Sequence, residues 1–364
     1  MKKAVISIFV FIFFLLNPSF VYAQSEAAFT QDMIKGKVIK EDSRTYNDLG
    51  KLQKTTYKVR LENKKIINAE YIPSAITKLS ISVDSDVVLV KMNMKAGATY
   101  QIVDAYRLPS LVYFLVAFII IAIIIVGRRG LGSLLGLIIS LVVILYGIVP
   151  LILKGYDPLL VTICFSVVIL FFTTYLAHGV SRQTTIALVA TFISLLLTLG
   201  VSYVCVWVLK LNGLGNENVY DLYFATGNAI NAKGLLLSGI VIATLGALND
   251  VTVTQAVTVF EMKKLDHKLN FMGLFKNGLN IGRVHGASMV NTLVLAYAGS
   301  SLFVFIFFIV NPQKQPLWAI LNNEFMVEEI VTSLGGTMGI LLSVPLVTLM
   351  AAWAAMKYTK TNSN

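Results

Sequence analysis

The stretch PSLVYFLVAFIIIAIIIVG, residues 109–127, is 19 residues long and contains no charged side chain. A helix of that length rises about 28 Å, which matches the roughly 30 Å hydrocarbon core of a bilayer. The basic pair Arg128-Arg129 follows it, whereas residues 24–108 before it have the mixed composition of a soluble segment. The stretch therefore predicts a membrane-spanning helix that follows a soluble N-terminal domain.

Apolar runs of similar length recur toward the C-terminus and predict about seven transmembrane helices in all. The chain of 364 residues is 56% hydrophobic and 13% charged, whereas soluble domains carry roughly 25% charged residues. We therefore predict an α-helical polytopic protein of the cell membrane, with a transmembrane bundle at 109–356 and a cytoplasmic tail at 357–364. The further spans are predicted at 131–152, 158–177, 184–208, 234–259, 286–310 and 334–356.

The N-terminus has the features of a secretory signal peptide. Lys2 and Lys3 precede an apolar segment at 4–16, and Val21-Tyr22-Ala23 ends in a small residue suited to cleavage. We predict a signal peptide at 1–23 that is cleaved after Ala23, with an uncleaved anchor helix as the alternative. In both cases the chain from residue 24 onward begins outside the cytoplasm.

Residues 24–108 are predicted to form a small extracytoplasmic all-β domain. Short runs rich in Val, Ile, Tyr and Thr, some with the alternation of half-buried strands, are separated by turn residues. Five such runs in so short a segment indicate a barrel of OB-like or SH3-like type. The domain shows no catalytic constellation, so we expect it to bind a protein partner or to gate the bundle. The strands are predicted at 34–39, 55–61, 65–71, 86–92 and 100–105.

Basic residues predict the orientation of the bundle. If residue 108 lies outside, alternation of the spans puts ten basic residues on the cytoplasmic side and four on the other side, the β domain excluded. This bias agrees with the positive-inside rule, so the C-terminus is predicted in the cytoplasm. The ten are Arg128, Arg129, Arg182, Lys263, Lys264, Lys268, Lys276, Arg283, Lys357 and Lys360, and the four are Lys154, Lys210, Lys233 and Lys314.

Several classes of protein are excluded. The net charge of +11 comes from basic residues scattered over short loops, so we expect contact with the lipid bilayer and no nucleic-acid binding. The two cysteines, Cys164 and Cys205, lie in apolar spans and offer neither a disulfide nor a metal site. No cluster of His, Cys, Asp or Glu has catalytic spacing, and we predict no enzyme activity, cofactor or metal.

Small residues four apart predict faces for helix packing in lipid. Gly132-xxx-Gly136 opens the second span and Gly335-xxx-Gly339 opens the last, where Pro345 predicts a kink. We interpret these positions as packing contacts, with a substrate path as the alternative. The fourth span carries a small polar stripe with the same two interpretations, formed by Thr191, Ser194, Thr198 and Ser202.

The fifth span is unusually polar, because it places Asn249, Asp250, Thr254 and Gln255 in an apolar context. A carboxylate at a helix centre costs about 2.5–3.5 kcal/mol on insertion scales, so it needs a partner, a proton or a water-filled cavity. The helical period puts Asp250 and Thr254 on one face and Gln255 on another. We interpret Asp250 as part of an ion or proton site. The alternative is that the span ends near residue 248 and Asp250 caps the helix that follows.

The approach to the sixth span supports a site nearby. Arg283 and His285 enter it from the cytoplasmic side, and His285 lies on one narrow face with Asn291 just off it. That face could pack against the fifth span and bring Arg283 or His285 toward Asp250 or Glu261. The alternative for His285 is a polar anchor at the membrane boundary. The predicted polar intramembrane site comprises Asn249, Asp250, Thr254, Gln255, Arg283, His285 and Asn291.

These two polar stretches carry a family resemblance. Residues 246–256, GALNDVTVTQA, followed by Gly282-Arg283 and by NTLVLAYAG at 291–299, resemble the YibE/F-like family of bacterial multipass membrane proteins. The resemblance extends over the membrane region, roughly 109–356, and over the layout of signal and β domain before it. It implies a membrane protein without naming a substrate.

Two functions remain open. The first is a permease, or a component of one, for a small solute or ion. The number of spans, the polar fifth span and a Gly-rich segment at 212–234, which could re-enter the bilayer, favour it. The alternative is an assembly or scaffold protein of the cell envelope whose β domain binds a partner, favoured by the lack of internal repeats typical of transporters. We prefer the permease.

Overall fold

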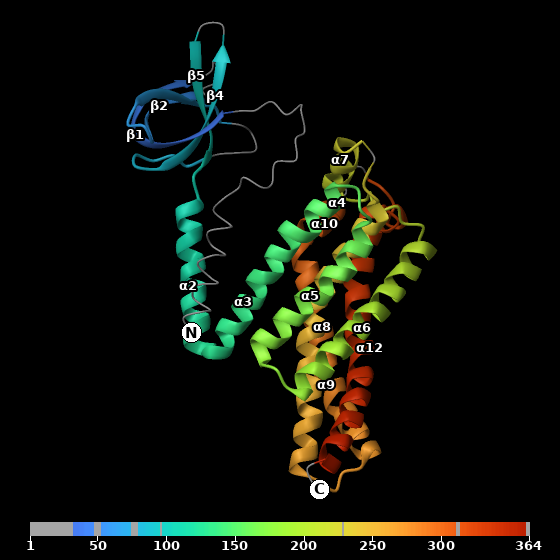
Figure 1. Cartoon of the computed structure of the whole chain (residues 1–364). Helices are drawn as coiled ribbons and strands as arrows, with labels where there is room; N and C mark the ends of the chain where they lie inside the picture. Colours follow the sequence, from blue (N-terminus) through green and yellow to red (C-terminus); the bar gives the residue numbers. More distant parts are fainter. Residues whose placement is uncertain are drawn as a thin grey trace. The chain divides into compact units, whose positions relative to one another are not determined.

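The computed structural model describes residues 32–46, 52–73, 79–94, 97–227, 229–310 and 314–361. The predicted signal peptide at 1–23 lies outside these residues. The described chain forms two compact units, one ending at Ile124 and the other beginning at Ile125. The first holds a β barrel and nearly all of one long helix, and the second holds the remaining helices (Figure 1).

Five strands close into a barrel in the order β1-β2-β3-β5-β4, which confirms the predicted small barrel. β1 pairs antiparallel with β2 and β4, whereas β3 pairs in parallel with β5, and this arrangement agrees with the OB-like type. Val59, Leu89 and Ile102 are among the side chains that fill its core. The strands are β1 (Asp32–Tyr46), β2 (Leu52–Leu61), β3 (Ile66–Tyr71), β4 (Asp86–Met94) and β5 (Gly97–Ala105).

The helix α2 (Leu108–Val126) follows β5 almost directly. At the junction Arg107 Nη1 donates a hydrogen bond to Asp104 Oδ2 at 2.8 Å, and this bond lowers the pKa of the Asp104 carboxyl. No residue of α2 is buried. Its apolar side chains point in every direction, as expected of a helix surrounded by lipid.

The second unit is a bundle of helices. In the described part of the chain, six helical segments are long and apolar enough to cross a membrane, α2 included, and α9 with α10, bent by 66°, is a seventh if the pair is one span. The elements are α3 (Arg128–Val142), the π-helix η2 (Val143–Ile148), α4 (Val149–Leu153), α5 (Pro158–His178), α6 (Arg182–Val208), α7 (Glu217–Ala225), α8 (Ala232–Leu265), α9 (Phe271–Ser300), α10 (Leu302–Val310), α11 (Leu317–Leu321) and α12 (Glu324–Thr361).

The helix α8 lies at the centre of this bundle, where it contacts α5, α6, α9 and α12 (Figure 1). The helices α6 and α12 also contact each other, and α3 packs on the outer side of α5. The predicted packing role of Gly132-xxx-Gly136 is confirmed there. A methyl group at Gly132 would overlap the backbone of Leu176, and one at Gly136 would lie 3.1 Å from Thr173 Cα.

Polar caps set the helix starts, and two spans begin ten or more residues earlier than predicted. Asn270 Oδ1 accepts a hydrogen bond from Gly273 N at 2.8 Å, so α9 begins at Phe271 and not at residue 286. Because α8 also runs on to Leu265, the predicted cytoplasmic segment 261–285 is mostly helical.

The last span shows a similar difference. The helix α12 begins at Glu324, ten residues before the predicted start at residue 334, and ends at Thr361. Pro345 lies inside this helix, which continues on both sides of it. The early start brings the acidic residues of its first turns into the bundle.

Three connections meet at one end of the bundle, which we call the carboxylate end. Asn231 Nδ2 donates to Asp157 Oδ2 at 3.0 Å and joins the connections that precede α8 and α5. The carboxylate of Glu324 accepts hydrogen bonds from Asn212 N at 2.6 Å and from Asn212 Nδ2 at 2.8 Å. The start of α12 is thus tied to the connection after α6.

Candidate functional site

Hydroxyl side chains line the contact between α6, α8 and α12. Thr191, Ser194, Thr198 and Ser202 of α6 recur every three or four residues, which places them on one helix face. At most 1% of each is exposed. The Thr191 hydroxyl is hydrogen-bonded to the hydroxyl of Thr252 on α8, so this polar face turns inward.

Glycines of α12 make room for these hydroxyls. A methyl group at Gly335 would lie 2.8 Å from Ser202 Oγ, and one at Gly339 would overlap Thr198. The predicted packing role of the Gly335-xxx-Gly339 face is therefore confirmed. Small residues allow such close approach of helices in lipid, and here they bring hydroxyl groups against the backbone of α12.

Two buried amides connect α8 to its neighbours. Gln255 Nε2 donates to Gly278 O of α9 and to Thr348 Oγ1 of α12, both at 2.7 Å. Asn249 Oδ1 accepts a hydrogen bond from Thr174 Oγ1 of α5 at 2.7 Å. Both amides are at most 6% exposed. Asn249 thus joins α8 to α5, and Gln255, six positions further along α8, joins it to α9 and α12.

Some of the buried hydroxyls have no hydrogen-bond partner. Most bond within their own helix, as Thr198 Oγ1 does to Ser194 O at 2.8 Å and Thr244 Oγ1 does to Ile240 O at 2.6 Å. Among the described residues, the hydroxyl oxygens of Thr162, Ser194 and Ser202 are buried without a partner. Leaving such a group unpaired costs roughly 1–3 kcal/mol, so these hydroxyls would gain from contact with a solute or water.

Three carboxylates gather at the carboxylate end, in the first turns of α12. Glu324 is held by Asn212 as described above. Glu328 is 6% exposed and accepts a hydrogen bond from Gly215 N at 3.1 Å. Glu329 accepts one from Ser301 Oγ at 2.8 Å. In the part of the chain that the structure describes, no Lys or Arg forms an ion pair with any of the three.

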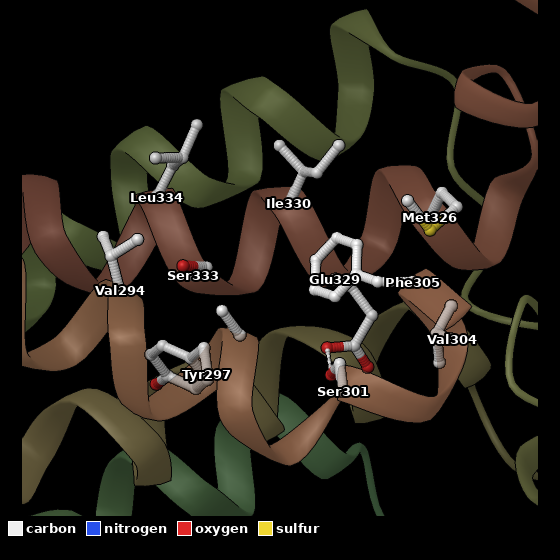
Figure 2. Close-up of a pocket in the computed structure, with 11 residues that line it drawn as sticks. Val294, Tyr297, Ser301, Val304, Phe305, Met326, Glu329, Ile330, Ser333 and Leu334 are labelled. Carbon is white, nitrogen blue, oxygen red and sulfur yellow. Dashed lines mark hydrogen bonds between the residues drawn. The ribbon is translucent and has the colours of Figure 1, made fainter. Parts of the chain in front are cut away.

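Two cavities meet at Glu329. One, of about 210 Å³, lies between α12 and the α9–α10 pair. The other, of about 250 Å³, lies between α12, α8 and the segment after α6, and Glu328 also lines it. Figure 2 shows the Glu329 side chain reaching from α12 toward Ser301, with the Tyr297 ring on the same side of the first cavity. Glu329 therefore lines both cavities, its carboxylate reaches Ser301 in the first, and no described Lys or Arg pairs with it.

The structure separates the seven residues of the predicted site. Asn249 and Gln255 are buried in the bundle, whereas Asp250 and Thr254 lie on a different, exposed face of α8. The helix runs unbroken from Ala232 to Leu265, so the alternative interpretation of Asp250 as a helix cap is wrong. Asp250 interacts electrostatically with His178, at the end of α5.

The other three residues of the predicted site, Arg283, His285 and Asn291, lie on α9. Arg283 and Asn291 are exposed and His285 is half-buried. No hydrogen bond or ion pair of the described residues joins any of the three to Asp250. It is instead the glycines of α9 that face the core: a methyl group at Gly282 would lie 2.8 Å from Gln255 Nε2.

Sequence reasoning missed Glu328, Glu329 and Ser301. The predicted last span began at residue 334, which left the two acids in a loop. An available signal was the order of residues at 324–332, where acids precede a long apolar helix, because acidic side chains are favoured in the first turn. For Ser301 no local signal exists, since its role depends on the bend between α9 and α10.

The membrane part of the chain also matches a known family. Residues 114–357 match the family model of the YibE/F-like protein. The chain belongs to the YibE/F-like family. The match runs from α2 to α12 and covers the hydroxyl face, the carboxylate end and both cavities, while the barrel precedes it. No curated protein and no solved structure matches the chain. Within the described ranges, no group of three or more His, Cys, Asp or Glu residues is placed to hold a metal ion.

Proposed function

We propose that this YibE/F-like protein is a permease, or the membrane component of one, for a small solute or ion. The observation that carries the proposal is the series of polar groups inside the bundle between Glu328 and Thr348 of α12. These residues are 20 positions apart, and a helix of that length rises about 30 Å, the thickness of the hydrocarbon core. Polar groups along such a length give a solute successive partners across the bilayer.

The carboxylate end supports the same proposal. Carboxylates within membrane segments are costly unless they are paired, and they commonly mark substrate or ion pathways. Glu328 and Glu329 are held by hydrogen bonds from Gly215 and Ser301 and have no basic partner among the described residues. We place this end outside the cytoplasm, because the basic residues favour the opposite end for the cytoplasmic side.

The test is solute uptake by the purified full-length protein in lipid vesicles. We expect at least one member of a panel of cations and small metabolites to accumulate above the level in protein-free vesicles, with and without an imposed proton gradient. Failure of the whole panel to enter, with folded protein in the vesicles, would count against the permease. It would favour the scaffold alternative, in which the barrel binds a protein partner.

A substitution at Asp250 tests whether uptake is coupled to a cation or proton. The Asp250→Asn variant keeps the size and hydrogen bonding of the side chain but removes its charge, so we expect coupled uptake to fall at least tenfold at unchanged protein level. The matched control is Glu261→Gln, on the same exposed face of α8, where Glu261 pairs with Lys264. Equal uptake by the two variants would exclude a coupling role for Asp250.

A further inference from the structure

The cavity between α12 and the α9–α10 pair has the lining of a site for an organic molecule. Seven of its eleven lining residues are apolar, and the other four are Tyr297, Ser301, Glu329 and Ser333. Pockets for small organic ligands are mostly apolar, with a few polar groups that fix the orientation. The volume of about 210 Å³ suits a ligand of modest size.

Among the described residues of this lining, the Glu329 carboxylate is the only charged group. Its Oε2 accepts a hydrogen bond from Ser301, and no described basic residue compensates its charge. The low dielectric around it makes an anionic ligand unfavourable and a cationic one favourable. The rings of Tyr297 and Phe305, which also line the cavity, can attract a cation through their faces.

An inorganic cation fits this lining poorly. Ca²⁺ takes six to eight oxygen ligands and Mg²⁺ requires six in a regular octahedron. The cavity offers only the side-chain oxygens of its four polar residues among an apolar majority. The apolar side chains of the lining, among them Val294, Ile330 and Leu334, suit a hydrocarbon body instead.

We propose that this cavity binds a small organic amine in its protonated form, with Glu329 as the counter-ion and the apolar walls around the hydrocarbon part. The ammonium group would donate to Glu329 and to the hydroxyl oxygen of Ser301. This inference names a class of substrate for the proposed permease. Transport of the amine rests on the proposed function, whereas binding of the amine does not. Binding itself is measured separately.

The test is equilibrium binding of radiolabelled phenethylamine to the purified full-length protein in detergent. Three unlabelled competitors share one hydrocarbon body and differ in charge: phenethylammonium, phenethyl alcohol and phenylacetate. We expect phenethylammonium to displace the label at concentrations at least tenfold lower than the alcohol does, and phenylacetate not to displace it. Equal competition by the amine and the alcohol would overturn the proposal, since it would show partition into micelles or apolar binding alone.

Two variants assign the binding to this cavity. We expect Glu329→Gln to raise the dissociation constant at least tenfold, and Ala298→Leu, which fills the cavity, to raise it as well. The control is Glu324→Gln, in the same helical end but bonded to Asn212 and outside the lining, for which we expect a change below twofold. The comparison uses variants whose midpoint of thermal unfolding equals that of the unmodified protein. Unchanged binding in Glu329→Gln refutes the inference, whereas intact binding without vesicle uptake refutes only the permease.

Discussion

At the scale of single residues, Gln255 shows how one side chain joins three helices. It lies on α8, and its Nε2 donates to Gly278 of α9 and to Thr348 of α12. Its neighbour Thr254 is exposed on the other side of the same helix. The two residues are adjacent in the sequence and belong to the same helix, but one is buried and the other is exposed. They therefore form a matched pair for substitution.

We predict that Gln255→Ala lowers the free energy of unfolding by about 1–3 kcal/mol, because it removes two buried hydrogen bonds and leaves the Gly278 carbonyl without its side-chain donor. For Thr254→Ala we expect a change within about 0.5 kcal/mol. Unfolding of the detergent-solubilised protein, followed by circular dichroism, measures both. Similar losses in the two variants would contradict the assignment of Gln255 to the packed interior.

At the scale of elements, the bundle depends on where glycines allow helices to touch. Gly132 of α3 packs against the backbone of Leu176 on α5, and a backbone cannot move aside as a flexible side chain can. Gly200 of α6 is exposed, with no atom within 4 Å of an added methyl group. Both residues lie within helices, so the intrinsic effect of a substitution on the helix is similar at the two sites.

We predict that Gly132→Ala destabilises the protein by about 1–3 kcal/mol through overpacking. Gly200→Ala should be neutral or stabilising by up to about 1 kcal/mol, because Ala favours the helix. The midpoint of thermal unfolding in detergent separates the two expectations. A stable Gly132→Ala variant would mean that α3 does not pack closely on α5 in the protein.

At the scale of the whole molecule, the order of the helices predicts which connections share a side of the membrane. Asn216 caps α7 at the carboxylate end, and Lys268 lies in the short connection between α8 and α9, at the other end of α8. The positive-inside rule predicts that Asn216 lies outside and that Lys268 lies in the cytoplasm. The barrel, which contains Ser85, is predicted outside.

We predict that a cysteine at Ser85 or Asn216 reacts with a membrane-impermeant thiol reagent on intact cells, whereas a cysteine at Lys268 reacts only after permeabilisation. The background for these variants replaces the native Cys164 and Cys205. The readout is mass tagging of the purified protein. Labelling of position 268 from outside would reverse the predicted orientation.

The sequence by itself determined which segments of this protein are membrane-spanning helices and which are strands of the barrel. Runs such as 109–127 are long and apolar enough to require a membrane, and the alternation of residues in β2 requires a half-buried strand, because both patterns follow from the local geometry of helix and strand. The packing roles of Gly132 and Gly335 were also predictable, since their spacing alone places them on one helix face. The start of α9 was within reach as well, through the cap at Asn270.

Only the tertiary structure decided which polar residues meet. The helical period separated Asp250 from Gln255, but it could not say which face would be buried, because that depends on the glycines that α9 and α12 present to α8. It could not bring Ser301 to Glu329 either, since they are 28 positions apart and Ser301 lies at the 66° bend between α9 and α10. Local sequence fixes the faces of each helix, whereas the site arises where faces from distant helices pack together.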